Sequence, residues 1–161
     1  MQHALIRPVQ PQDNVQMAAI IQQVLKEFNA NKPGTAYFDN STHDVYNSFR
    51  NPAAGYWVIS AQGHIWGGGG IYPTEGLPSG YCELVKLYLL PPARGRGWGR
   101  QLIAQCLQAA AQKGYTHVYL ETMPELHTAI PLYERTGFTY LPAPLGQSGH
   151  YGCNVWMVKA L

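Results

Sequence analysis

Residues 85–103, VKLYLLPPARGRGWGRQLI, limit the fold most, because a strand pattern changes there into a helix pattern through a turn rich in glycine and arginine. The apolar run over residues 81–90 predicts a strand, which two prolines end because proline has no N–H for a strand ladder. Apolar side chains at helical spacing predict a helix over about residues 97–112. A further strand over residues 116–122 follows, so this unit predicts a right-handed parallel crossover.

The other segments complete a mixed sheet. A hairpin is predicted around the turn AQG, and an apolar stripe from Met17 to Phe28 predicts the first helix. The predicted strands cover residues 4–9, 55–60, 64–72, 81–90, 116–122, 138–141 and 153–161, and the predicted helices begin near Asp13, Ser41 or Thr42, Gly97 and Thr128. The order is β-α-α-β-β-β-α-β-α-β-β. We therefore expect one α/β domain (α+β mixed) over residues 1–161, with a twisted sheet of about seven strands flanked by about four helices.

The composition excludes several classes of protein. Apolar residues make up 46% of the 161 residues and charged residues 12%, which is typical of a globular domain. A net charge of +2 is too small to favour a nucleic acid or a membrane surface as partner. The three cysteines show no metal-type spacing, and no signal segment opens the chain. We expect free thiols and a cytoplasmic protein.

The glycine-arginine turn has the features of a phosphate site. The first N–H groups of a helix have no partner within the helix, and the helix dipole adds positive charge there. Glycine lets an anion approach these amides closely. No lysine or hydroxyl follows Gly99, as a nucleoside triphosphate loop requires, and glycines at alternate positions do not fit a dinucleotide fingerprint. A glycine triplet alone would also fit a solvated turn.

Two motifs favour a phosphate site over a solvated turn. RGRGWG matches the pattern [RQ]-x-x-G-x-[GA] through Arg94, Gly97 and Gly99. AIPLYERTGF looks like the segment A-x-x-x-Y-x-x-x-G-F, with Tyr133 at the tyrosine. Together with the element order, these motifs show that the sequence resembles the GNAT N-acetyltransferase superfamily. The resemblance implies a transferase that moves an acetyl group from acetyl-CoA to a primary amine by direct attack.

The resemblance also implies where coenzyme A binds. The backbone N–H groups of about Gly95 to Arg100 would bind its pyrophosphate, and the pantetheine arm would run along the preceding strand. The cofactor-binding residues that it implies are Leu87, Tyr88, Leu89, Arg94, Gly95, Arg96, Gly97, Trp98, Gly99 and Arg100. Many members have an asparagine where this chain has Leu126, so that contact is lost or replaced by a neighbour such as His127.

The catalytic residues follow from the same resemblance. Tyr133 matches the general acid that protonates the leaving thiolate, and an amide near Tyr88, freed by a strand bulge, would bind the oxyanion. Glu121 and Glu83 both match positions used for the general base, and a structural ion pair or a chain of waters is the alternative. Strand alternation places Glu83 on the same face as Val85, Leu87 and Leu89, where burial would raise its pKa.

The acceptor is a small-molecule or peptide amine. Aromatic residues in the regions that form the family's acceptor pocket hint at an apolar or cation-accepting pocket, and they are Phe28, Tyr37, Phe38, Trp57, Trp66, Tyr72, Tyr140, Tyr151 and Trp156. Four glycines over residues 67–70 fit a nearby ligand, a strand bulge or a plain loop. His150 is more consistent with a surface residue than with a site residue, and no metal is expected. A non-catalytic acyl-CoA-binding or sensing module is the alternative function, and self-association as a homodimer is left open.

Overall fold

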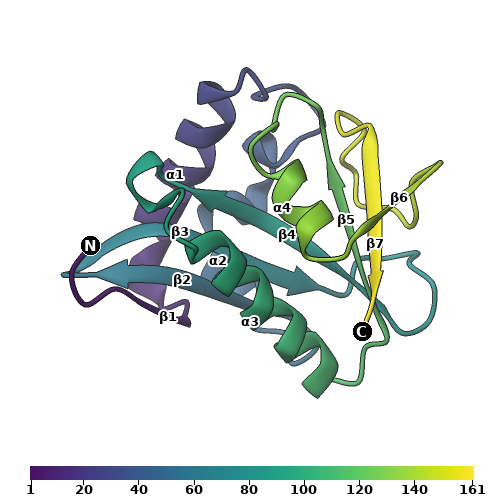
Figure 1. Cartoon of the computed structure of the whole chain (residues 1–161), viewed down its shortest axis with the longest axis horizontal. Helices are drawn as coiled ribbons and strands as arrows, with labels where there is room; N and C mark the ends of the chain where they lie inside the picture. The colour runs from purple at the N-terminus through teal and green to yellow at the C-terminus, as the bar shows by residue number, and fades with distance from the viewer.

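The computed structural model describes all residues from Met1 to Leu161 and has the predicted element order (Figure 1). The strands are β1 (Leu5–Pro8), β2 (Gly55–Ala61), β3 (His64–Tyr72), β4 (Tyr81–Leu89), β5 (His117–Thr122), β6 (Thr139–Leu141) and β7 (Val155–Ala160). The helices are α1 (Asn14–Glu27), α2 (Val45–Ser48), α3 (Trp98–Gln112) and α4 (Ile130–Arg135), with short 3-10 turns at Pro11–Asp13, Ala36–Phe38, Asn40–His43 and Pro91–Ala93. The expected mixed sheet of seven strands with four helices is confirmed.

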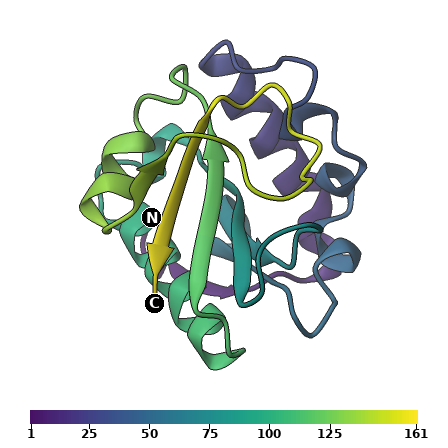
Figure 2. The same ribbon diagram turned by 90° about the vertical axis from the view of Figure 1, so that its right-hand side faces the viewer.

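All seven strands form one sheet in the order β1-β2-β3-β4-β5-β7-β6. Only β4 and β5 pair in parallel, as the crossover through α3 requires. Their pairing covers Tyr81–Glu83 of β4 and His117–Tyr119 of β5, and the two strands separate beyond these residues. Figure 2 shows β5 and β7 side by side as antiparallel neighbours. The edge of β4 that faces β5 is therefore unpaired from residue 84 onward.

Two apolar clusters cover the two faces of the sheet. One contains Met17, Ile21 and Leu25 of α1, and the other contains Ile103 and Cys106 of α3. The helix α2 begins at Val45 and is capped by Asp44, which accepts a hydrogen bond from the amide of Asn47 (3.2 Å), not by Ser41 or Thr42. None of the helices is both long and apolar enough to cross a membrane.

A bulge in β4 changes which residues share a face. Lys86 has a φ of +50°, and three residue steps from Val85 to Tyr88 lie opposite two steps of β3. Val85 and Tyr88 consequently pack against the α1 cluster, whereas Leu87 packs against the α3 cluster. The predicted alternation, which put Glu83 on one face with Leu87 and Leu89, is therefore wrong beyond the bulge.

The four glycines of β3 lie opposite this bulge. A Cβ atom at Gly68 would lie 2.7 Å from the ring of Tyr56 and 2.8 Å from the sulfur of Met17. A Cβ at Gly69 would lie 2.6 Å from the side chain of Leu87. Side chains of the protein itself therefore fill the space above and below these glycines. Of the interpretations open for this run, the strand bulge is confirmed, and the plain loop is wrong.

Candidate active site

A row of unpaired amides lies at the turn between β4 and α3. Gly95 and Gly97 have φ values of +69° and +83°, in the left-handed region that favours glycine. The first backbone hydrogen bond of α3 runs from the Gln101 amide to the Gly97 carbonyl (3.0 Å), and the six amides from Gly95 to Arg100 donate to no protein acceptor. These amides and the positive end of the helix dipole provide a binding site for an anion.

A cavity of about 520 Å³ begins at this turn and continues along the unpaired edge of β4. Most of the expected site residues line it, namely Leu87, Tyr88, Leu89, Arg94, Gly95, Gly97, Gly99, Arg100, Glu83, Glu121 and Tyr133. Arg96 and Trp98 lie in the same turn but do not line the cavity. The structure thus brings the two motifs and both candidate bases to one continuous space.

Arg94 is engaged with the protein itself. Its guanidinium makes two hydrogen bonds of 2.7 Å to the carboxylate of Glu27, and its Nε donates to the carbonyl of Leu89 (2.9 Å). The guanidinium also lies 5.1 Å from the ring centre of Phe28. This arginine therefore ties α1 to the turn, whereas Arg96 and Arg100 are exposed.

Tyr133 of α4 also lines the cavity. Tyr133 is 7% exposed, and burial raises the pKa of its hydroxyl above the usual range, so the hydroxyl keeps its proton. Leu126 lines the cavity, whereas the ring of His127 packs edge-on against Phe28 (5.3 Å between centres). Thr122, which the sequence analysis missed, also lines the cavity, and its hydroxyl is buried without a hydrogen-bond partner.

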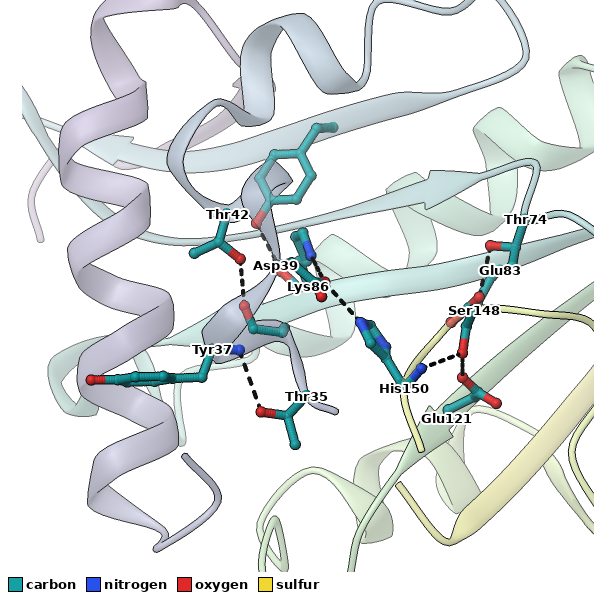
Figure 3. A network of polar contacts seen from close by, with 12 residues as sticks. Thr35, Tyr37, Asp39, Thr42, Thr74, Glu83, Lys86, Glu121, Ser148 and His150 are labelled. Atoms are coloured by element: carbon teal, nitrogen blue, oxygen red, sulfur yellow. Dashed lines mark hydrogen bonds and ion pairs between the residues drawn. The ribbon is translucent and has the colours of Figure 1, made fainter. Parts of the chain in front are cut away.

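Glu83 and Glu121 lie together where β4 and β5 separate (Figure 3). Glu83 is only 2% exposed and accepts a hydrogen bond from the hydroxyl of Thr74 (2.7 Å). Burial, with a contribution from the nearby charge of Glu121, raises the pKa of Glu83 to about 7. Glu121 accepts hydrogen bonds from the hydroxyls of Tyr119 (2.7 Å) and Ser148, which stabilise its charged form.

A second polar group adjoins the glutamates. Lys86 Nζ (2.6 Å) and His150 Nε2 (2.7 Å) both bind the same oxygen, Oδ2, of Asp39 (Figure 3). Burial alone would lower the pKa of His150, but the hydrogen bond and charge of Asp39 outweigh it and raise this pKa. His150 is therefore a hydrogen-bonded residue that also lines the cavity. Asp39 and Lys86 were missed, although a lysine within a buried strand was a usable signal.

The glutamates and His150 are also close enough to hold a metal ion. One oxygen of Glu83, one of Glu121 and one ring nitrogen of His150 lie within 4.8 Å of one another. Each of the three already has a protein partner: Thr74, Tyr119 with Ser148, and Asp39, respectively. The arrangement is thus satisfied by hydrogen bonds within the protein.

A second cavity of about 480 Å³ meets the first one, and Glu83, Val85, Lys86 and His150 line both. Its wall is mostly polar and includes Asp39, Ser41, Ser48, Thr74, Glu75, Gln147 and Ser148. Of the aromatic residues expected around an acceptor, only Tyr72 lines this cavity, beside Phe49. The wall of this cavity is therefore polar rather than apolar, and the cavity suits a small polar molecule.

Comparison with known proteins gives the family. Residues 19–138 match the model of the acetyltransferase (GNAT) family. The chain belongs to this family. Over 162 aligned residues this GNAT N-acetyltransferase is 38% identical to Uncharacterized N-acetyltransferase YjgM of Escherichia coli (strain K12), covering 99% of this chain and 96% of that one. The predicted resemblance is confirmed.

Solved structures agree on the fold. An acetyltransferase of the GNAT family from Staphylococcus aureus Mu50 superposes with a TM-score of 0.86 at 15% identity, covering 98% of both chains. A GNAT phosphinothricin acetyltransferase from Sinorhizobium meliloti, in complex with AcCoA, has a TM-score of 0.76 at 18% identity and covers 98% of this chain and 88% of that one.

Proposed function

We propose that this enzyme transfers the acetyl group of acetyl-CoA to a primary amine by direct attack. The observation on which the proposal rests is the continuous cavity from the unpaired amides of Gly95–Arg100 to Glu83 and Tyr133. The Sinorhizobium meliloti relative, which has the same fold, was solved with AcCoA, and this supports the same cofactor here.

Two parts of the cavity would bind two parts of acetyl-CoA, its diphosphate and its pantetheine arm. The diphosphate would accept hydrogen bonds from the amides of Gly95–Arg100. The amide groups of the pantetheine arm would pair with the unpaired edge of β4 at Leu87–Leu89, as an added strand does.

Glu83 is the better general base of the two glutamates. A pKa of about 7 lets its carboxylate accept a proton from the acceptor ammonium near neutral pH, whereas the carboxylate of Glu121 already accepts hydrogen bonds from two hydroxyls. Glu83 also lines both cavities, so it reaches the junction where amine and thioester would meet. Glu121 lies beside it and would attract the ammonium.

The reaction then needs no covalent enzyme intermediate. The neutral amine attacks the thioester carbonyl, and an amide near Tyr88, beside the bulge, donates to the oxyanion. The C–S bond breaks, and the protonated Tyr133 gives its proton to the leaving thiolate. The acetylated nitrogen releases its second proton to water, and the Tyr133 phenolate recovers a proton from water as coenzyme A leaves.

Acetyl-CoA titration by calorimetry and a thiol-release assay with a panel of amines test the proposal. We expect Tyr133→Phe to lower kcat by about 100-fold or more, because a positioned acid contributes roughly that much, with little change in the Kd of acetyl-CoA. Tyr140→Phe is the matched control, since Tyr140 is exposed beyond the site. An unchanged kcat and pH–rate profile in Tyr133→Phe would remove the acid role.

The same assay separates the rival functions. A non-catalytic acyl-CoA-binding or sensing module would bind acetyl-CoA, release no thiol when amines are added, and tolerate loss of Tyr133, Glu83 and Glu121. A nucleotide-phosphate binder would bind ATP or GTP in preference to coenzyme A. Amine-dependent release of thiol excludes both.

A further inference from the structure

Positive and negative side chains lie next to each other where the two cavities meet. Glu83 and Glu121 supply the negative charge, and a ring nitrogen of His150 lies within 4.8 Å of an oxygen of each. Lys86 supplies positive charge, to which His150 adds when its ring is protonated, and both bind one oxygen of Asp39. One carboxylate oxygen is thus shared by two nitrogen donors on this side of the junction.

Lys86 also has hydrogen-bonding capacity that the protein leaves unused. Its side chain is 4% exposed, and its ammonium has three N–H donors but only Asp39 as a hydrogen-bond acceptor. A donor left without an acceptor in a buried place costs free energy, which an oxygen of a bound molecule would recover. Lys86 lines both cavities, so an acceptor molecule in either one lies next to this residue.

The position of these charges restricts the group next to the reacting nitrogen. A ring nitrogen of His150 lies within 4.8 Å of an oxygen of Glu83, and Lys86 binds the same Asp39 oxygen as His150. A small amine whose nitrogen reaches Glu83 therefore has these two residues close to its neighbouring carbon. An apolar substituent would meet charged walls there, and a second ammonium would be repelled by Lys86 and His150. A carboxylate would instead pair with them.

Resting on the proposed function, we propose that the acceptor is a free α-amino acid with a polar side chain, its ammonium at Glu83 and Glu121 and its carboxylate at Lys86 and His150. The peptide amide beside a protein N-terminus carries no charge and would not use these cations. Serine and threonine hydroxyls and Gln147 line the rest of the second cavity and suit a polar side chain. Glu75, which lines only this second cavity, is exposed, so solvent screens its charge.

Pairs of acceptors that differ only in the carboxylate test the inference on the unaltered enzyme. At saturating acetyl-CoA, kcat/KM is compared for serine, serinamide and ethanolamine, and for lysine and cadaverine. We expect each amino acid to exceed its decarboxylated partner and its amide by at least about tenfold. Equal or higher values for the amines or the amide would overturn the inference and leave the N-acetyltransferase function standing.

Lys86→Met tests the residue assignment. We expect the ratio of kcat/KM for serine to that for ethanolamine to fall by at least about tenfold; the rate with both acceptors changes as well, because Lys86 also binds Asp39. Lys32→Met is the matched control, because Lys32 forms an exposed ion pair with Glu125 and lines neither cavity. An unchanged preference for serine in Lys86→Met would overturn the assignment, and Lys86→Arg, which keeps the charge, should retain part of it. Binding of acetyl-CoA without thiol release from any amine would instead overturn the proposed function.

Discussion

Replacing the buried Glu83 by glutamine should make the protein more stable at alkaline pH while it removes the general base. Glutamine has the same shape and can still accept the hydrogen bond from Thr74. The wild-type carboxylate lowers the free energy of unfolding when it is charged, because burial disfavours its charged form in the folded protein but not in the unfolded chain. The substitution removes this conflict at every pH.

The magnitude follows from the pKa of Glu83. Folding raises this pKa from 4.5 to about 7, so the stability present below about pH 4.5 is lost as the pH rises through about 7. This rise in the pKa corresponds to about 3 kcal/mol of unfolding free energy. About 1 kcal/mol of this is already lost at about pH 5.5, so Glu83→Gln should gain about 2 kcal/mol over the wild type between about pH 5.5 and 8.5.

Urea unfolding of both proteins at these two pH values measures the difference. A gain of about 2 kcal/mol corresponds to a rise in Tm of about 4–8 °C for a chain of this size. Glu134→Gln, which neutralises an exposed carboxylate of α4, is the control and should show no such pH-dependent gain. A stability difference between Glu83→Gln and wild type that is the same at both pH values would refute the argument, because it would mean that Glu83 titrates alike in the folded and unfolded chains.

Two further substitutions test the turn. Gly97→Ala should weaken acetyl-CoA binding by roughly fivefold or more, because alanine at a φ of +83° is strained by about 1 kcal/mol and disturbs the row of amides. The control Gly114→Ala, with a φ of +87° at the other end of α3, should cost similar stability without affecting binding. Equal effects of the two substitutions on acetyl-CoA binding in calorimetry would contradict the site. Arg94→Gln should lower the Tm by a few degrees, because the side chain loses its hydrogen bonds to Glu27 and Leu89. Glu27→Gln should lower the Tm by a smaller amount. A large loss of acetyl-CoA affinity in Arg94→Gln alone would show that Arg94 binds phosphate instead.

The element order could be predicted because it depends on local patterns. The stripe of α1 and the glycine turn before α3 each lie within some twenty residues of sequence, and each predicted the right element. The cavity residues around the turn could be predicted for the same reason, since one short motif holds most of them.

The polar cluster at the junction could not be predicted in this way. Asp39 is separated in the sequence from Lys86 by 47 positions and from His150 by 111 positions. Contacts over such separations produce no periodic pattern in the sequence. Asp39 lies in a loop between two helices, and His150 lies in the loop before β7, where sequence patterns fix no backbone path. Only the folded sheet brings these loops together.

The bulge at Lys86 shows how one local irregularity organises the site. Without it, strict alternation would put Leu87 on the same face as Glu83 and turn the side chain of Lys86 to the other face. The extra residue lets Glu83 and Lys86 line the same two cavities, although they are three positions apart on one strand. The glycines of β3 allow this, because a side chain at Gly69 would collide with Leu87, as β4 now holds it. The four glycines of β3 and the lysine within β4 are thus both sequence signs of the bulge. The bulge places the proposed base and the proposed carboxylate-binding cation side by side.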